Sequence, residues 1–242
     1  LTLVMILSLA MLTGCGGGDS DEGDSTSSTG NTGYQWSLPT GFPTPKEFAD
    51  NPLTAAKVEL GRHLFYDLRM SVNQTTACAT CHLPERAFTD GRKTAIGATG
   101  EAHPRNAMSL TNVVYNATQN WANPVVTTLH AQGLIPMFGE FPLELGWSDH
   151  EAEILARFRN DAQYQSLFAA AYPSETDPVN ADRVVKAIAA FESILISGNS
   201  PYDQATFQGN RDAMSAAARR GRELFFSERM ECFHCHGGFN FS

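Results

Sequence analysis

Apolar residues recur at three- and four-residue spacing along much of the chain, which is the pattern of amphipathic helices. The first such stretch is residues 54–67 and their flank, with apolar positions at Val58, Leu60, Leu64, Phe65 and Leu68. No stretch shows the alternation of apolar and polar residues that a half-buried strand requires. The pattern therefore predicts a mainly α fold.

Further helices are predicted in the second half of the chain. Ser148 and Glu151 form a capping-box pattern ahead of an apolar run. Asn180 or Asp182 is expected to cap a long helix with one apolar stripe, formed by Val184, Ile188, Phe191 and Leu195. Shorter helices are predicted over residues 164–172 and 212–226.

Glycine and proline interrupt the pattern in the first half. Residues 83–104 and 121–146 contain many of them, so both stretches are predicted to be long irregular loops, where functional residues often lie. Residues 105–117 between them are expected to contain a short helix.

Two short motifs have the spacing C-x-x-C-H, namely Cys78-Ala79-Thr80-Cys81-His82 and Cys232-Phe233-His234-Cys235-His236. This is the attachment pattern of a c-type haem, because two thiols on one helical turn can both form thioethers with one porphyrin edge. The adjacent histidine can then bind the iron as its proximal ligand. A zinc site or a redox dithiol would explain one C-x-x-C. Two copies that both end in histidine favour two covalently bound haem c groups.

The chain also repeats itself ahead of each motif. Residues 61–70 and 221–230 share the pattern Gly-Arg-x-Leu-Phe and a final Arg-Met. Self-similarity of this kind indicates duplication of a structural unit. We therefore predict two related, cytochrome c-like haem domains with long irregular loops, one over residues 53–147 and one over residues 148–242.

Charge and cysteine usage narrow the class of protein. The 242 residues carry a net charge of −9, which argues against a nucleic-acid partner because nucleic-acid binding needs a basic face. Four of the five cysteines belong to the two motifs, so no pair is left for a disulfide.

The fifth cysteine, Cys15, follows an apolar run and ends the sequence Leu-Thr-Gly-Cys. The run is too short to span a bilayer, which takes about 20 residues, and is typical of a secretory signal. Leu-Thr-Gly-Cys resembles a bacterial lipoprotein signal, so residues 1–15 are predicted to be part of a signal peptide, with Cys15 as the lipidated residue. Residues 16–52 are then a flexible tether followed by a proline-rich strap. This predicts a periplasmic protein that a lipid holds to a membrane, the outer rather than the inner one.

The sequence stops six residues after His236. A haem needs cover on both faces, and nothing after His236 supplies cover for a second haem. We therefore expect the C-terminal domain to be incomplete and the chain to be a C-terminal truncation.

These residues resemble the bacterial dihaem cytochrome c peroxidase and MauG superfamily over about residues 53–242. The likeness rests on residues 60–67, both haem motifs, Pro104-Arg105-Asn106, Trp121, Gln132 and Pro142-Leu143-Glu144-Leu145. Within the superfamily, residues 103–107 and Trp121-Ala122-Asn123-Pro124 are most similar to the MauG-like branch that includes the methanobactin-associated MbnH enzymes.

The resemblance implies a role for each of these residues. Hydrogen peroxide would react at the N-terminal haem, with Glu144 and Gln132 on its distal side, and the C-terminal haem would store or relay an electron. Trp121 would lie between the haems as an electron bridge. Asn106 would contribute to a calcium site between the domains. A carboxyl suits proton transfer during O–O cleavage, and an amide oxygen is a hard ligand suited to Ca²⁺.

One departure from the family separates its subclasses. Many of the peroxidases carry a distal histidine in the loop after the first motif, where this chain has Ala98 and Thr99. His103 lies next to Pro104, which restricts its backbone, and its register differs from that of the family ligand. We therefore expect an open sixth position at the first haem, which is typical of MauG.

Three functions follow in order of preference. The first is a peroxide-dependent oxidoreductase that oxidises a protein side chain, a tryptophan above others, by long-range electron transfer. The second is a conventional peroxidase that reduces peroxide to water with electrons from a small cytochrome or cupredoxin. The third is an electron carrier without a catalytic centre, against which Glu144 and Gln132 argue.

Overall fold

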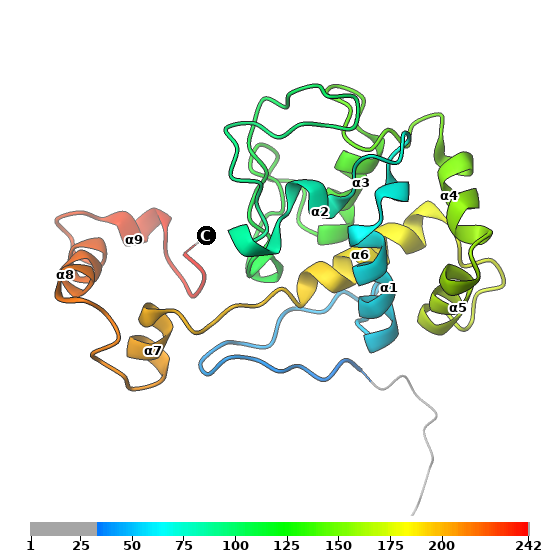
Figure 1. Cartoon of the computed structure of the whole chain (residues 1–242). Coiled ribbons are helices and arrows are strands. Elements are labelled where there is room, and N and C mark those ends of the chain that lie inside the picture. Colours follow the sequence, from blue (N-terminus) through cyan, green and yellow to red (C-terminus); the bar gives the residue numbers. More distant parts are fainter. Residues whose placement is uncertain (1–32, 242) are drawn as a thin grey trace, which may run out of the picture. The chain divides into compact units, whose positions relative to one another are not determined.

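Two helices cross at the centre of the described part of the chain, which is residues 33–241 of a computed structural model. α1 (Ala55–Tyr66) packs on α6 (Ala181–Ser193), α5 (Ala162–Ala171) packs on α1, and α3 (Leu129–Phe138) packs on α6 (Figure 1). Residues 33–241 contain isolated β-bridges but no strand. The prediction of a mainly α fold is confirmed for this part of the chain.

The remaining helices have between 4 and 10 residues. Residues 105–117 form a single 3-10 turn rather than a longer helix. The bounds are α2 (Cys78–Cys81), α4 (Glu151–Arg159), α7 (Pro201–Phe207), α8 (Ala216–Phe225) and α9 (Cys232–Cys235), with 3-10 turns η1 (Leu68–Met70), η2 (Pro84–Arg86) and η3 (Val113–Tyr115).

The crossing of α1 and α6 depends on a glycine. A Cβ atom placed on Gly61 would lie 1.8 Å from the carbonyl oxygen of Ala187 in α6. Leu60 and Leu64 beside it are fully buried, as is Val184 on α6. The two helix backbones therefore touch at Gly61, and the core closes around that contact.

Replacing Gly61 with alanine is expected to destabilise the fold by about 2–3 kcal/mol, because overpacking against backbone forces the helices apart. The duplicated position supplies a matched control. A Cβ atom placed on Gly221 in α8 would meet no other atom within 4 Å, so Gly221→Ala should leave stability unchanged or raise it slightly. Thermal unfolding of the haem-loaded variants measures both. Equal effects of the two substitutions would contradict the packing argument.

The prediction that residues 121–146 are irregular is wrong at its centre, where α3 forms. Thr128 caps this helix by accepting a hydrogen bond from the Ala131 amide. Gly133 fits because a Cβ there would lie 2.7 Å from a methyl group of Val185. Pro136 sits in the last turn, where it removes one hydrogen bond without ending the helix. Packing on α6 therefore outweighs two residues that disfavour helix.

The predicted capping box at the start of α4 is also wrong. α4 begins at Glu151 with His150 as its N-cap, and the Ser148 hydroxyl instead donates to the Phe138 carbonyl at 2.9 Å. The cap of α6 is confirmed as Asn180, whose side chain accepts from the Arg183 amide at 3.0 Å. Its apolar stripe is buried as predicted at Val184, Ile188 and Phe191.

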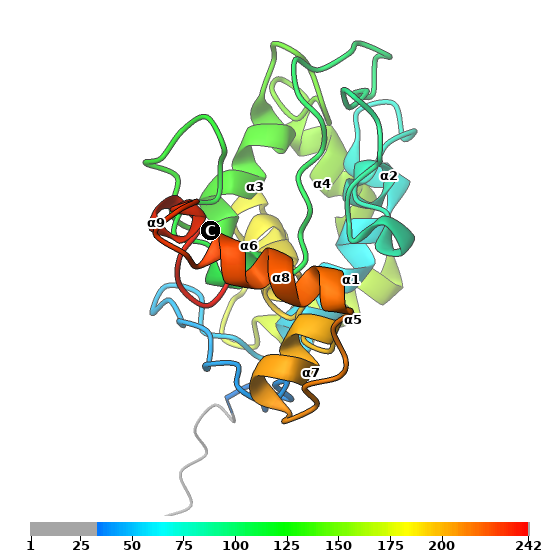
Figure 2. The same ribbon diagram turned by 90° about the vertical axis from the view of Figure 1, so that its left-hand side faces the viewer.

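Residues 33–52 form an extended strap without helix that runs past the C-terminal helices. Phe42 on this strap makes edge-to-face contacts with Tyr115, Phe207 and Phe239. Figure 1 shows α7, α8 and α9, orange to red, following α6 through a segment without helix, and Figure 2 looks onto this group. No residue of these three helices is buried, so aromatic contacts and the strap hold the group in place.

The buried core extends from Leu60 to Phe191, which includes residues on both sides of the expected domain boundary at 147. The division into two haem domains stays a prediction. Cys15, the signal and most of the tether lie outside the described residues. Within residues 33–241 no helix is long and apolar enough to cross a membrane.

Candidate haem-binding site

The segment that leads from α1 into the first motif is held by a buried tryptophan and a half-buried arginine. Trp147 is fully buried and donates from its indole N–H to the Met70 carbonyl at 2.7 Å. The Arg157 guanidinium donates to the carbonyls of Ser71 and Val72 at 2.7 and 2.9 Å. Because these bonds satisfy backbone groups that no helix pairs, the segment is ordered by the protein alone.

The two thiols of the first motif lie on the single turn α2. Both are free and half-buried, and the Cys81 thiol lies 3.9 Å from the Ile96 carbonyl oxygen. Burial raises the pKa of both thiols, and the negative charges of Glu192 beside Cys78 and of Glu144 beside both thiols raise it further. Two carboxyl groups therefore lie close to the point where a haem would be attached.

His82 is oriented for metal binding by a backbone carbonyl. Its Nδ1 donates to the Phe88 carbonyl oxygen at 2.7 Å, which leaves the lone pair on Nε2. Burial lowers the pKa of His82, so the ring is neutral at pH 7. Metal-binding histidines usually donate their second ring N–H to such a group, which fixes the tautomer and the ring plane.

The carbonyl that orients His82 belongs to a tightly bent loop. Ala87 and Phe88 both have left-handed backbone, with φ of 54° and 60°, which is uncommon for residues other than glycine. The hydroxyls of Ser109 and Thr111 donate to the Ala87 carbonyl, and the Phe88 amide donates back to the Leu83 carbonyl at 2.8 Å. Uncommon backbone of this kind persists where surrounding contacts hold it.

Glu144 reaches the first motif because two loops pack backbone to backbone. A Cβ on Gly97 would lie 2.0 Å from the Leu143 carbonyl oxygen, and the Ala98 amide donates to the Glu144 carbonyl at 2.9 Å. The Glu144 carboxylate lies 3.4 Å from Nδ1 of His103. Burial raises the pKa of Glu144, and positive charge on His103 opposes that rise. This carboxyl is therefore poised to exchange a proton nearer to neutral pH.

The other residues predicted for the site are not brought together by side-chain contacts. Gln132 is half-buried on α3, while Asn106 is exposed. The Trp121 side chain is 81% exposed and makes no ring contact with any residue between 33 and 241. Their roles stay predictions.

Glu192 is a buried carboxyl that the sequence motifs do not single out. It lies on α6 with 6% of its surface exposed, and burial raises its pKa to about 8. It follows Ile188 by four residues and so lies on the apolar stripe of the helix. A glutamate on the apolar stripe of a helix can be recognised in the sequence, so Glu192 could have been found there. No sequence pattern indicates that His103 pairs with Glu144.

The second motif repeats the arrangement of the first at an exposed position. Cys232 and Cys235 lie on the single turn α9, and Nδ1 of His236 donates to the Phe241 carbonyl oxygen at 3.3 Å. Large apolar side chains stay exposed around it, including Phe226 and Met230. Such a surface suits an apolar macrocycle.

The residues of both motifs fit covalent haem. Each has two free thiols on one turn and a histidine whose Nδ1 is engaged by a carbonyl, so that Nε2 is left for iron. Calcium has no comparable support. Between residues 33 and 241 no group of three or more His, Cys, Asp or Glu side chains gathers as a metal site, so the calcium assignment to Asn106 rests on resemblance.

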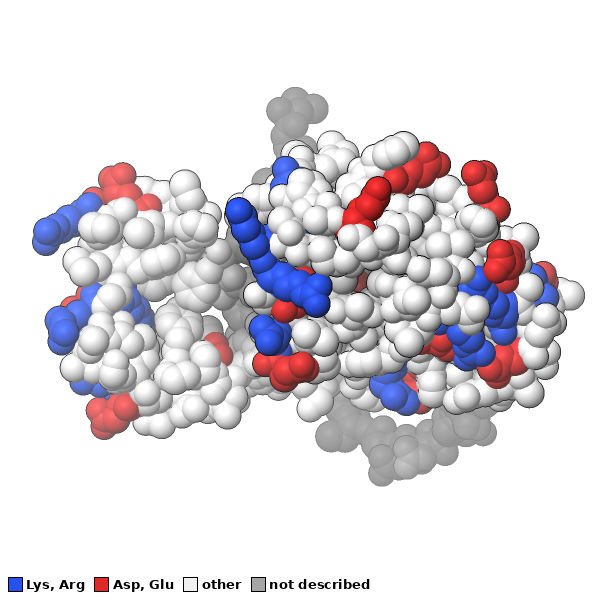
Figure 3. All heavy atoms as spheres, turned by 45° about the horizontal axis from the view of Figure 1, so that its top comes forward, with Lys and Arg blue, Asp and Glu red and all other residues white. Residues whose placement is uncertain are grey.

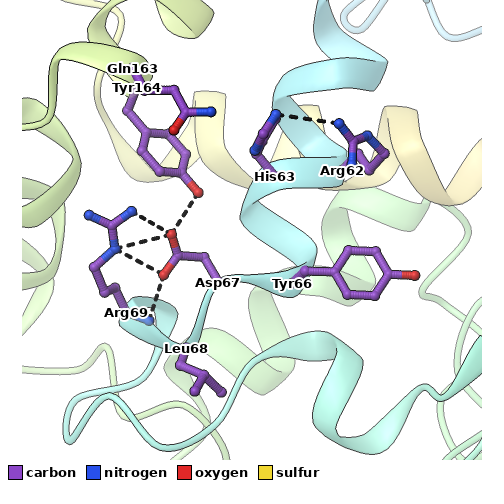
Figure 4. Close-up of a pocket in the computed structure, with 8 residues that line it drawn as sticks. All are labelled: Arg62, His63, Tyr66, Asp67, Leu68, Arg69, Gln163 and Tyr164. Carbon is purple, nitrogen blue, oxygen red and sulfur yellow. Dashed lines mark hydrogen bonds and ion pairs between the residues drawn. The ribbon is translucent and has the colours of Figure 1, made fainter.

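A cavity of about 470 Å³ lies elsewhere, between the end of α1 and the start of α5 (Figure 4). Its charged groups are already paired. Arg69 forms ion pairs with Asp67 and Asp161, and the Tyr164 hydroxyl donates to Asp67 at 2.8 Å. Although burial opposes it, these bonds lower the pKa of Asp67 overall. The cluster ties α1 to α5 and offers no free group for chemistry.

Charges on the outer surface are mixed in sign. Figure 3 shows acidic and basic side chains interspersed on one face. Several form exposed ion pairs, such as Arg62 with Glu59 and Arg159 with Asp177. Pairs of this kind contribute little to stability.

Comparison with known proteins gives a consistent result. Residues 55–212 match the family model for di-haem cytochrome c peroxidase. A cytochrome c peroxidase of Escherichia coli K12 is 35% identical over 187 residues, which are 77% of this chain and 38% of that protein. The methylamine utilization protein MauG of Methylorubrum extorquens is 33% identical over 204 residues, covering 84% of this chain and 55% of that protein.

A solved structure is also similar. The crystal structure of a MauG-like protein associated with microbial copper homeostasis superposes with a TM-score of 0.80 at 45% sequence identity. The superposition covers 85% of this chain and 58% of that one. The chain thus spans about half the length of these relatives, from 38% to 58%.

Proposed function

The chain belongs to the di-haem cytochrome c peroxidase family of enzymes, and from that premise we propose that it reacts with hydrogen peroxide beside Glu144 and transfers the oxidation to a protein substrate. The observation that carries this proposal is the Glu144 carboxyl itself. It is half-buried, has a raised pKa, lies close to both thiols of the first motif and is paired with His103. An electron carrier has no need of such a group.

We propose a separate role for each residue at the first motif. Cys78 and Cys81 would attach the haem and His82 would bind its iron through Nε2. A haem held there would supply the iron chemistry and the two electrons that cleavage of the peroxide O–O bond requires. Glu144 then takes the proton from the nearer peroxide oxygen and returns it to the departing oxygen, which leaves as water. The carboxyl ends the step in the state in which it began.

The reaction needs two electrons for each peroxide, together with two protons, to give two molecules of water. We propose that Cys232, Cys235 and His236 hold a second haem, which relays electrons through Trp121. The ultimate donor would be a side chain of a protein substrate, a tryptophan by similarity to the MauG and MbnH branch. The exposed position of Trp121 leaves its indole free to approach a second redox centre.

The chain departs from the conventional peroxidases where they carry a distal histidine. Ala98 and Thr99 occupy that place, and the nearest histidine, His103, has its Nδ1 directed to Glu144. Together with the 45% identity to a MauG-like protein, this supports a first haem that is open to peroxide without prior reduction. The alternative is a conventional peroxidase that receives electrons from a small cytochrome or cupredoxin. The similarity to the E. coli cytochrome c peroxidase supports this alternative.

Covalent haem attachment and the predicted Cys15 lipid both suit the periplasm. We propose that the protein acts there, held to the outer membrane by its N-terminal lipid, with a periplasmic protein as its partner. Asn106 is proposed as a calcium ligand by resemblance alone.

The proposal is tested by adding one equivalent of hydrogen peroxide to the ferric, haem-loaded protein and recording its visible and EPR spectra. A high-spin haem whose spectrum changes at once, without added reductant, is the expected result. Two low-spin haems that react only after one electron has been added would instead indicate the conventional peroxidase. A protein that reacts in neither state would be an electron carrier.

A further inference from the structure

His103 is nearly buried, yet one of its ring nitrogens has no partner. Its side chain is 11% exposed, and Nδ1 lies 3.4 Å from the Glu144 carboxylate. Its Nε2 is buried and makes no hydrogen bond with any residue between 33 and 241. A histidine that serves only the fold normally has both nitrogens satisfied. The second nitrogen is therefore available to a group other than these residues.

The loop that carries His103 is built to hold it in place. The His103 amide donates to the Ala95 carbonyl at 2.8 Å, and the Ala95 amide donates to the Arg105 carbonyl at 3.0 Å. An isolated bridge between Ile96 and Ala102 closes the same loop. Residues 95–105 thus form a short hairpin-like unit.

The same unit holds the backbone of Glu144. Gly97 touches the Leu143 carbonyl and the Ala98 amide donates to the Glu144 carbonyl. Both members of the His–Glu pair are therefore fixed by one loop, and their relative position does not depend on distant parts of the fold.

We propose that His103 is a positioning residue for Glu144, which it orients beside the first haem motif through Nδ1 while its Nε2 contacts the loaded site. The inference rests on the proposed peroxide chemistry of Glu144. With Nδ1 facing the Glu144 carboxylate, Nε2 is the ring nitrogen left for a group of the loaded site. Catalytic contacts are often long or poorly aligned before substrate binds and tighten in the reactive complex, so the 3.4 Å separation is compatible with this role.

Three substitutions separate the two ring nitrogens. His103→Asn places an amide N–H near the position of Nδ1, His103→Gln places one near the position of Nε2, and His103→Leu supplies neither. His150→Leu is a matched control, because His150 lies 3.5 Å from Glu153 in a similar pair at an exposed position. Circular dichroism and the haem spectrum check that each variant is folded and loaded.

The rate of reaction with peroxide should fall about 10- to 100-fold in His103→Leu, because small displacements of a reacting group are costly. His103→Asn should recover most of that loss, whereas His103→Gln should not. His150→Leu should be unchanged. A loss of equal size in all three His103 variants, or none in His103→Leu, overturns the proposal.

A second readout does not depend on turnover. The carboxyl stretch of Glu144, assigned by its disappearance in Glu144→Gln, can be followed by infrared difference spectroscopy against pH. Because positive charge on His103 lowers the pKa of Glu144, the midpoint should move to higher pH in His103→Leu. The other nearby charged groups, Glu101 and Arg105 on the same loop and Asp90 and Arg92 near Cys81, are the same in every variant. An unmoved midpoint contradicts the proposal.

Two outcomes distinguish this inference from the function on which it rests. If Glu144→Gln abolishes the peroxide reaction and His103→Leu does not, the peroxide chemistry stands and the role of His103 fails. If the ferric first haem is low-spin and becomes high-spin in His103→Leu, then Nε2 is an axial iron ligand, and the positioning role is overturned.

Discussion

Glu144→Gln is expected to slow the reaction of the haem-loaded protein with hydrogen peroxide by about 10²- to 10⁴-fold, the range that general acid–base groups contribute. Glutamine keeps the size and the hydrogen-bonding capacity of the side chain but cannot take up the peroxide proton. Stopped-flow spectroscopy under excess peroxide measures the rate directly. In the native protein the rate should also fall as the pH drops through the raised pKa of Glu144, because the carboxylate form accepts the proton.

The matched control is Glu140→Gln, an exposed glutamate four residues earlier on the same segment. It should react at the native rate. A Glu144→Gln protein that reacts within about threefold of native would show that another group moves the proton, since acid–base groups contribute far more than this. In that case Gln132 and His103 become the residues to replace next.

The helices around α1 and α6 could be predicted because their stripes are regular and their caps are strong. Asn180 caps α6 as expected, and the stripe from Val184 to Phe191 is buried. α3 could not be predicted from its own residues, since Gly133 and Pro136 both disfavour a helix. It forms because Gly133 lets α3 approach Val185 on α6, a contact between segments far apart in the chain.

The two C-x-x-C-H motifs can be recognised in the sequence because the chemistry that they imply is local. Two thiols and a histidine within five residues are enough to define each motif. Their orientation could not be predicted, because the carbonyls that fix His82 and His236 belong to Phe88 and Phe241 in bent loops. Glu144 was likewise indicated by family resemblance. Its pairing with His103 could not be predicted, because it depends on how two loops pack.

The two similar segments, residues 61–70 and 221–230, differ in how the structure supports them. Gly61 carries a helix crossing, whereas its counterpart Gly221 touches nothing. The first motif is enclosed by α1, α6 and two loops. The second is held by contacts of Phe239 with Phe42 on the strap and with Tyr115, and by a hydrogen bond from Asn240 to Asn116. The proton transfer proposed at the first motif would benefit from an enclosure that excludes water. The electron relay proposed at the second motif would have no such requirement.

Glu192→Gln is expected to stabilise the protein at neutral and alkaline pH and to flatten the pH dependence of its stability. Burial raises the pKa of Glu192 to about 8 in the folded state, against about 4.3 in an unfolded chain. Between these values the folded state holds the proton that the unfolded state has lost. The free energy of unfolding therefore falls as pH rises through this window. The loss of stability is complete above pH 8, where Glu192 is ionised in both states.

The expected size is about 3 kcal/mol between pH 5 and pH 8, because each tenfold difference in acidity is worth about 1.4 kcal/mol. Denaturant unfolding of the ferric, haem-loaded protein at both pH values measures it, with Glu47→Gln at an exposed position as the control. The native protein and the control should lose stability between the two pH values, and Glu192→Gln should lose much less. A parallel loss in all three would mean that another group, such as a ligand of the haem, dominates the pH dependence. Glu192 would then be ionised in the folded state, which requires a partner for its charge beside Cys78.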